Sequence, residues 1–464
     1  MTFDRRTFIA AAGAASSAPL LSACATPGAT STAAVSSAPH PFMVGKPSQP
    51  LLPRSKAPRI VIAGGGWGGL TTAANLRQLA PQAEVVLLDR NPVFFSSPLS
   101  NLWLVNMVDG EQLTHDYLRV ADKLGYKFFQ AEVQQVDRDR RVVTTSLGTL
   151  DYDWLVLAPG IRYHYEAWFG NDRQAADATR TRYPCAYASN AEHLAIKRAL
   201  HNFKGGELVL NLPPPPHRCP PSPYERACLI AWHFKTHKIK GHVTILDHKP
   251  SIAPIGLGYR RAFDELYKDF ITYVPNAQVQ EVDPFNQRIR TSAGDQRFDH
   301  AILMAPHQAG DLAWLAGAVS KDTNGWADVD PVTMQLKGDA RSFVIGDAIA
   351  AVSPLPFRYY PKSAHIANRL GRIVAYQISE HIAGRTPERR LPDNLCYMVV
   401  NGTPAEALNV QFDYSFDTQG RIVQKQMDFN DRTPSLYQDD FRWADFMFTE
   451  LFGGGAPAVT PMRA

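Results

Sequence analysis

The stretch PRIVIAGGGWGGLTTAANLRQLAPQAEVVLLD, residues 58–89, decides the fold of this chain. A β-branched apolar run at 60–62 leads into a glycine-rich turn, an Ala/Leu-rich helical pattern follows, and a second apolar run ends on Asp89. This order of strand, turn, helix and strand predicts a βαβ unit and therefore a parallel sheet.

The glycines of the turn have separate expected roles. Gly64 permits the tight turn, Gly66 lets the backbone approach a pyrophosphate, and Gly69 lets the helix pack closely on the strand. Asp89 lies 20 residues past the last glycine, where a carboxylate can accept hydrogen bonds from ribose hydroxyls. We therefore predict that the unit binds an ADP-bearing dinucleotide. Three neighbouring residues are expected at the same site: Trp67, Gly68 and Arg90.

Composition describes an ordinary globular protein. The 464 residues are 45% hydrophobic and 20% charged, and the length suffices for two or three domains. The formal net charge of +4 is small and spread along the chain, and no basic cluster is interleaved with aromatic residues. We predict no nucleic-acid partner and no metal site.

The N-terminal residues have the pattern of an export signal. Residues 1–24 combine the pattern Arg5-Arg6-Thr-Phe-Ile with a short Ala-rich apolar run, which predicts twin-arginine export to the periplasm. The run ends in Leu-Ser-Ala-Cys24, either a lipobox whose cysteine carries a lipid anchor or an ordinary cleavage site; we favour the lipobox. A Thr/Ser/Ala/Pro-rich linker is expected over residues 25–57.

A second unit of the same plan is predicted after residue 205. Strand patterns at 207–212 and 242–247 flank a helical pattern at 227–238. The turn between the first strand and the helix, residues 213–225, is rich in proline, which removes amide donors and bars close backbone approach. We therefore predict that the second unit does not bind NAD(P)H.

Three further segments complete the expected cofactor site. A buried strand pattern ends in Ala158-Pro159-Gly160, and with the βαβ unit it resembles the FAD domain of flavoproteins with two dinucleotide-binding domains. Val133 would then offer its backbone to the adenine, and Gly346-Asp347 ends a strand where a carboxylate can bind a ribityl chain. Lys362 opens a helix and is either a partner of the N1/C2=O edge of a reduced flavin or a solvated cation.

The expected fold class is α/β, with two Rossmann-like domains of the dinucleotide-binding type and a C-terminal α+β domain. The first domain, residues 58–170 and 305–385, binds FAD, and the second, residues 171–304, is degenerate. Residues 386–464 form an interface domain rich in aromatics.

The proline-rich turn carries a more specific resemblance. The pattern PPxxRCPPxPYERA, with Gly-Asp-Ala, PKSxxxAN and Asn-x-Cys-Tyr downstream, resembles the flavoprotein subunit of flavocytochrome c sulfide dehydrogenase, a relative of the sulfide:quinone oxidoreductases. In that family a cysteine attaches to FAD; here Ser97 stands at this position, close to Asn101 in the same loop, which implies noncovalent FAD. The family's second redox cysteine is replaced by Ile349.

The resemblance implies thiol–disulfide chemistry at Cys219, with Glu225 as an acid/base group. Because Ile349 removes the usual partner, a Cys185–Cys219 couple is the expected substitute, and a buried core role for Cys185 is the alternative. Cys228 and Cys396 are expected to be structural.

Electrons must leave through a partner, because the chain contains no Cys-x-x-Cys-His haem motif. The family precedent implies oxidation of a small sulfur substrate with a c-type cytochrome as acceptor. Two alternatives stay open: a flavoenzyme that reduces quinone or acts on another sulfur compound, and a catalytically impaired flavoprotein that serves as a binding or assembly subunit.

Overall fold

A computed structural model describes residues 48–188, 191–350, 360–453 and 462. The twin-arginine segment, Cys24 and most of the expected linker lie outside these residues and stay predictions. Within the described part of the chain, no helix combines the length and apolar character needed to cross a bilayer.

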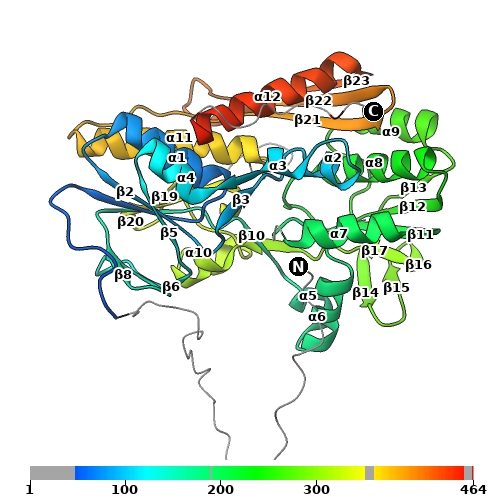
Figure 1. Cartoon of the computed structure of the whole chain (residues 1–464), viewed down its shortest axis with the longest axis horizontal. Helices are drawn as coiled ribbons and strands as arrows, with labels where there is room; N and C mark the ends of the chain where they lie inside the picture. The colour runs from blue at the N-terminus through cyan, green and yellow to red at the C-terminus, as the bar shows by residue number, and fades with distance from the viewer. Residues whose placement is uncertain (1–47, 189–190, 351–359, 454–461, 463–464) are drawn as a thin grey trace, which may run out of the picture. The chain divides into compact units, whose positions relative to one another are not determined.

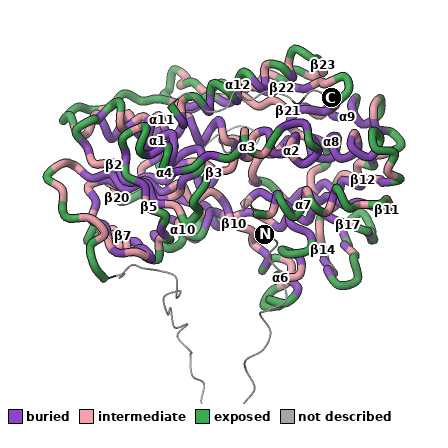
Figure 2. Tube along the Cα trace, viewed as in Figure 1, coloured by how far each residue is buried: buried purple, intermediate pink, exposed green. Residues whose placement is uncertain are grey.

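The first sheet is built around the stretch that the glycine pattern identifies. Its strand order is β19-β20-β9-β1-β2-β5, and all neighbours are parallel except β19 and β20. All five residues of β1 are buried, as Figure 2 shows for the centre of this sheet. The strands are β1 (Arg59–Ala63), β2 (Glu84–Asp89), β5 (Lys127–Gln130), β9 (Trp154–Leu157), β19 (Gln335–Leu336) and β20 (Asp339–Val344).

Two helices of this part lie side by side, α1 (Trp67–Leu79) and α11 (Ala364–Ile382) (Figure 1). Their contact depends on small residues, because a Cβ atom at Gly371 of α11 would lie 2.6 Å from the Gly68 carbonyl oxygen of α1. The two helix axes can therefore approach closely. Chain segments about 300 residues apart thus pack together in one unit.

The second sheet repeats the parallel plan with strand order β13-β12-β11-β17. Its strands are β11 (Gly205–Leu212), β12 (Lys240–Asp247), β13 (Ile271–Val274) and β17 (His300–Ile302), and helices α7 (Ala191–Asn202), α8 (Ser222–Thr236) and α9 (Gly256–Leu266) accompany it. Helix α8 begins at Ser222, five residues earlier than the expected start at Ala227. The proline-rich turn therefore ends at Pro221, and Glu225 belongs to the first turn of a helix with proline near its N-terminus.

The C-terminal part is an antiparallel sheet covered by one helix. Strands β21 (Asp393–Gly402), β22 (Ala405–Phe416) and β23 (Ile422–Thr433) are ordered as in the sequence, and α12 (Pro434–Phe452) contacts β21, β22 and α1 (Figure 1). On its other side β21 contacts α8. This part therefore touches both parallel-sheet units.

Short elements complete the described residues. The small sheets pair β3 (Val93–Phe95) with β4 (Thr114–Asp116), β6 (Val133–Asp137) with β7 (Val142–Thr145) and β8 (Thr149–Asp151), β10 (Ile161–Tyr163) with β18 (His307–Ala309), and β14 (Val279–Asp283) with β15 (Arg288–Thr291) and β16 (Gly294–Arg297). The short helices are α2 (Ser100–Leu104), α3 (Gly110–Leu113), α4 (Tyr117–Leu124), α5 (Glu166–Phe169), α6 (Arg173–Arg182) and α10 (Asp311–Leu315), with 3₁₀ turns at Lys321–Thr323 and Gly346–Ala348. The α/β fold class with two parallel-sheet units is confirmed.

Candidate functional site

A cavity of about 1470 Å³, including its open mouth, lies at the carboxyl ends of the first sheet. This is the edge at which parallel α/β sheets bind ligands. Most of the residues expected at the cofactor line it: Gly64, Gly66, Trp67, Gly68, Asp89, Arg90, Ser97, Val133, Ala158, Pro159, Gly160, Gly346 and Asp347.

The glycine turn has the shape that a phosphate-binding turn needs. Gly64 has a φ of 107°, and a Cβ atom at Gly69 would lie 1.9 Å from the Gly64 carbonyl oxygen, so both positions require glycine. Gly69 does not line the cavity, in keeping with its expected packing role. A Cβ atom at Gly66 would instead meet no protein atom within 4 Å, because this residue borders the cavity. The bare backbone at Gly66 therefore leaves room for a ligand.

Acidic side chains of the first sheet also fit a dinucleotide. Asp89 accepts hydrogen bonds from the amides of Gly65 at 2.7 Å and Asn91 at 2.8 Å, which fix its carboxylate at the cavity wall. Asp347 pairs with Arg218 through Oδ2 at 3.0 Å, whereas its buried Oδ1 has no hydrogen-bond partner among the described residues. A buried acceptor without a partner favours a ligand with hydroxyl donors, as the ribityl chain of FAD has.

Arg218 joins three segments at the end of this cavity. Besides Asp347, its guanidinium donates to the Ser97 hydroxyl at 2.9 Å and to the Tyr187 carbonyl oxygen. The proline-rich turn of the second unit is thereby tied to the first unit.

Two residues expected at the cofactor do not line this first cavity. Lys362 is buried, lines none of the cavities described in this section, and donates from Nζ to the carbonyl oxygens of Asp347 and Ile349 at 2.9 and 2.8 Å. It therefore supports the Gly-Asp turn and is not the solvated cation of the alternative, while its contact with a flavin edge stays a prediction. Asn101 faces a different cavity, where its amide donates to Glu225 at 2.6 Å.

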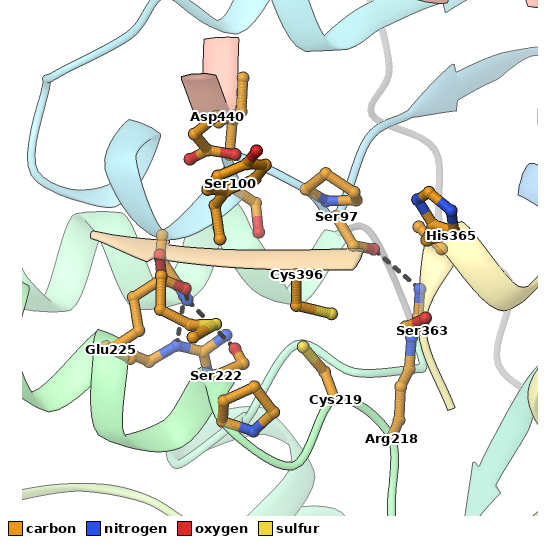
Figure 3. Close-up of a pocket in the computed structure, with 18 of the residues that line it drawn as sticks. Ser97, Ser100, Arg218, Cys219, Ser222, Glu225, Ser363, His365, Cys396 and Asp440 are labelled. Carbon is orange, nitrogen blue, oxygen red and sulfur yellow. Dashed lines mark hydrogen bonds between the residues drawn. The ribbon is translucent and has the colours of Figure 1, made fainter. Parts of the chain in front are cut away.

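That second cavity, of about 780 Å³, adjoins the first. The two share Ser97, Arg218, Ser363 and Ala364, and the wall of the second is completed by Cys219, Cys396, Glu225 and Asp440. Figure 3 shows these side chains reaching it from the proline-rich turn, from α8, from β21 and from α12. The site therefore draws on all three parts of the described chain.

Glu225 is a buried carboxyl with fixed partners. It is 9% exposed and accepts hydrogen bonds from the Asn101 amide and, at 2.9 Å, from the Val399 main-chain amide. Burial raises its pKa to about 7, against the opposing effects of these two donors and of Arg226. A carboxyl with this pKa can give or take a proton at neutral pH.

Asp440 is a second buried carboxyl that sequence reasoning missed. It is 3% exposed, and burial, with Glu225 as a smaller cause, raises its pKa well above the ordinary range. The signal was present, because Asp440 falls between Tyr437 and Phe441 and in register with Ala444 on the apolar face of α12. An acidic residue on such a face marks a buried polar site.

The four cysteines of the described residues separate into two groups. Cys219 and Cys396 line both the 780 Å³ cavity and a smaller one of about 450 Å³, and their side chains point toward one another (Figure 3). Cys185 and Cys228 are fully buried and line none of these cavities. Burial and nearby Glu192 raise the pKa of the Cys185 thiol. The structure thus corrects the expected partner of Cys219: the facing thiol is Cys396, and Cys185 belongs to the core.

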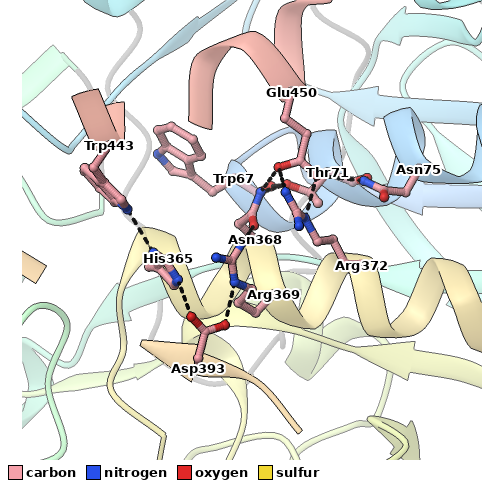
Figure 4. Close-up of polar contacts among 10 residues, drawn as sticks. All are labelled: Trp67, Thr71, Asn75, His365, Asn368, Arg369, Arg372, Asp393, Trp443 and Glu450. Carbon is pink, nitrogen blue, oxygen red and sulfur yellow. Dashed lines mark hydrogen bonds and ion pairs between the residues drawn. The ribbon is translucent and has the colours of Figure 1, made fainter. Parts of the chain in front are cut away.

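A polar network fixes α12 against the cofactor-binding helices (Figure 4). Glu450 pairs with Arg372 at 2.7 Å and accepts hydrogen bonds from Asn368 at 2.8 Å and Asn75 at 3.0 Å. His365, at the edge of the 780 Å³ cavity, accepts from the Trp443 indole at 2.9 Å. These contacts bridge α12, the helix that carries Asp440, to α1 and α11.

Comparison with known proteins agrees with this arrangement. Residues 58–182 match the profile of the family described as pyridine nucleotide-disulphide oxidoreductase. The chain has the fold of this class. Residues 194–305 of this disulphide-oxidoreductase fold match the profile described as sulfide dehydrogenase [flavocytochrome c] flavoprotein chain, central.

Individual relatives of this fold are distant. The sulfide-quinone reductase of Aquifex aeolicus is 26% identical over 239 residues, which cover 49% of this chain and 53% of that protein, so the match spans about half of the relative. A type II NADH:quinone oxidoreductase of Staphylococcus aureus is 29% identical over 71% of this chain and 84% of that protein. The crystal structure of the Aquifex aeolicus sulfide:quinone oxidoreductase superposes with a TM-score of 0.70 at 20% identity, covering 87% and 93% of the two chains.

Proposed function

We propose that this chain is an FAD-dependent oxidoreductase that oxidises a small sulfide-level sulfur substrate. The observation that carries the proposal is the position of Cys219, a thiol in a cavity that shares four wall residues with the dinucleotide cavity. The sulfur-related profile match over residues 194–305 and the Aquifex relative support this substrate class.

The FAD would be held noncovalently by the glycine turn, Asp89 and Asp347. Bound FAD supplies an acceptor for an electron pair. A covalent thioether bond to FAD would need a cysteine sulfur at position 97. Ser97 has a hydroxyl there instead, and this hydroxyl accepts a hydrogen bond from Arg218. Arg218, beside Cys219, favours the thiolate form of this cysteine and acts against the burial that raises its pKa.

Glu225 would serve the substrate as a proton acceptor. Its carboxylate lines the same cavity as Cys219, and a group with a pKa of about 7 can take the proton of a weakly acidic sulfur donor at neutral pH. Asn101 and the Val399 amide orient the carboxylate and leave no freedom for it to turn away.

Quinone is the acceptor that the comparisons favour, because the Aquifex and Staphylococcus relatives are both named as quinone reductases. A c-type cytochrome is the second candidate, supported by the flavocytochrome c profile match. Export by the twin-arginine route to the periplasm and a lipid anchor at Cys24 are part of the proposal and rest on the sequence of residues 1–24 alone.

The proposal is tested with purified protein reconstituted with FAD under anaerobic conditions. Sulfide should bleach the flavin, and the reduced protein should then pass electrons to a soluble ubiquinone analogue faster than to cytochrome c. Faster reduction of cytochrome c would reverse the choice of acceptor. Bound FAD that sulfide fails to bleach would instead indicate a binding or assembly subunit.

A further inference from the structure

We propose that Cys219 and Cys396 form a reversible disulfide that serves as the sulfide-accepting redox group of this chain. The pairing itself rests on the structure, and its role in sulfide oxidation rests on the function proposed above. Cys396 has no assigned role and was expected from the sequence to be a core residue.

The two thiols share the same space. Both line the 780 Å³ cavity and the 450 Å³ cavity, and Figure 3 shows the Cys396 side chain directed from β21 toward the Cys219 side chain on the loop before α8. The charges of the two thiolates also interact, since Cys396 is one cause of the raised pKa of Cys219. Between the two cavities, the paired thiols form part of a common wall.

The surrounding contacts hold the two backbone segments in register. The Cys219 amide donates to the Lys362 carbonyl oxygen at 2.7 Å, and the Val399 amide of β21 donates to Glu225 of α8 at 2.9 Å. In the second of these contacts, Glu225 lies six residues after Cys219 and Val399 lies three residues after Cys396. The loop and the strand that carry the thiols are therefore fixed relative to each other, which a repeatedly formed disulfide requires.

No other described cysteine competes for this position. Cys185 and Cys228 lie in the core away from the described cavities. Ile349 is buried, and its carbonyl oxygen accepts a hydrogen bond from Lys362. The sulfur that is absent at Ile349 is therefore replaced by one on a different element, β21.

The chemistry balances as thiol–disulfide exchange. An added cyclic disulfide oxidant converts the two thiols to the Cys219–Cys396 bridge, taking up two electrons and two protons to become a dithiol. Hydrosulfide then attacks one bridge sulfur, so that a new S–S bond forms a persulfide while the old S–S bond breaks and its electron pair leaves on the other sulfur as a thiolate.

One contact of Cys396 favours its thiolate form. The Asn394 side-chain amide donates to Cys396 Sγ at 3.5 Å, and Asn394 is itself oriented by the Ser363 hydroxyl, which donates to its Oδ1 at 2.6 Å. Burial raises the pKa of the Cys396 thiol to about 11, and the Asn394 contact acts against this rise.

The pairing is tested on the full chain by peptide mapping. The protein is oxidised with trans-4,5-dihydroxy-1,2-dithiane, unfolded in N-ethylmaleimide and digested without reductant. Wild type and Cys185→Ala should each give a peptide in which Cys219 is linked to Cys396, and Cys396→Ser should leave Cys219 alkylated. Alkylation of both thiols in oxidised wild type, or a link between Cys219 and Cys185, would overturn the proposal.

Anaerobic flavin bleaching separates this inference from the proposed function. In Cys396→Ser, sulfide should bleach the flavin roughly 100-fold more slowly than in wild type or in the control Cys228→Ala. Equal rates in Cys396→Ser and wild type would overturn the role of the pair and leave the proposed function standing. If the bridge forms in wild type but sulfide does not bleach the flavin, the pairing is supported and the sulfide substrate is refuted.

Discussion

The main-chain amide of Cys219 donates a hydrogen bond of 2.7 Å to the carbonyl oxygen of Lys362. Lys362 directly precedes the cap of α11 in the first unit, whereas Cys219 lies in the proline-rich turn of the second unit, two residues before its end. The bond holds Cys219 at a φ of 48°, in the left-handed region that L-residues seldom adopt. Cys219 therefore has a strained backbone conformation at the point where its thiol lies between the two units.

Replacement of Cys219 by glycine should therefore have little effect on folding. Glycine adopts this φ without the penalty of roughly 1–2 kcal/mol that a side chain incurs, which offsets the lost burial of the thiol. The free energy of unfolding, measured by urea titration, should stay within about 1 kcal/mol of wild type. Cys228→Gly, within α8, should lose roughly 2 kcal/mol or more. Equal losses in the two variants would show that Cys219 serves stability.

The glycine turn offers a matched pair of substitutions. Gly69→Ala places a Cβ atom 1.9 Å from the Gly64 carbonyl oxygen and should lower the melting temperature or prevent folding. Gly66 has a φ of −73° and open space beside it, so Gly66→Ala should fold normally but retain less FAD after purification. Melting temperature and the ratio of flavin to protein check both outcomes. Full FAD retention in Gly66→Ala would contradict the assigned approach of the pyrophosphate.

Glu225 should make the protein less stable as pH rises. Its folded-state pKa of about 7 lies above the ordinary 4.5, so between these values the folded state binds a proton that the unfolded state has released. Stability from this group is therefore fully present below about pH 4.5 and is lost as pH rises from there through 7, by up to about 3 kcal/mol.

The difference between wild type and Glu225→Gln isolates this effect from other titrating groups. The variant should gain stability relative to wild type between pH 5 and pH 8, in urea titrations at each pH. Parallel curves for the two proteins would show that Glu225 is ionised and well solvated in the folded state.

Sulfide should leave its sulfur on Cys219. In an exchange reaction the thiolate that is better stabilised leaves more readily, and the Asn394 amide donates to Cys396. The oxidised protein, mixed anaerobically with one equivalent of sulfide and trapped with an alkylating agent, should carry a persulfide on Cys219 and a free thiol on Cys396. Mass spectrometry that finds the persulfide on Cys396 would reverse the direction of attack.

Local patterns in the sequence predicted the dinucleotide cavity well. The glycines at 64–69, Asp89 and the Ala158–Gly160 turn act within single strand–turn–helix units, so their spacing alone fixes what their backbone does. The same logic does not predict the contacts of Asn101 and Lys362, because the direction of a long or amide side chain depends on partners from other segments. The Asn101 amide donates a hydrogen bond to Glu225, and the Lys362 ammonium group donates to two carbonyl oxygens.

The sulfur site was only half predictable. Cys219 stands in a specific motif, but Cys396 lies 177 residues later on a strand whose neighbours are set by the packing of β21 on α8. No spacing rule relates two such positions. The resemblance to sulfide:quinone oxidoreductases implies Cys185 as the partner, but the fold places the Cys185 thiol in the core, as the alternative interpretation expects.

The central claim is that the Cys219 thiol delivers electrons from sulfide to bound FAD, and anaerobic sulfide titration of the FAD-loaded protein tests it most directly. We predict that the visible flavin band of wild type bleaches in proportion to added sulfide, and that Cys219→Ser with equal FAD content keeps its band. An unbleached wild-type flavin, or a Cys219→Ser variant that bleaches as fast as wild type, would contradict the account.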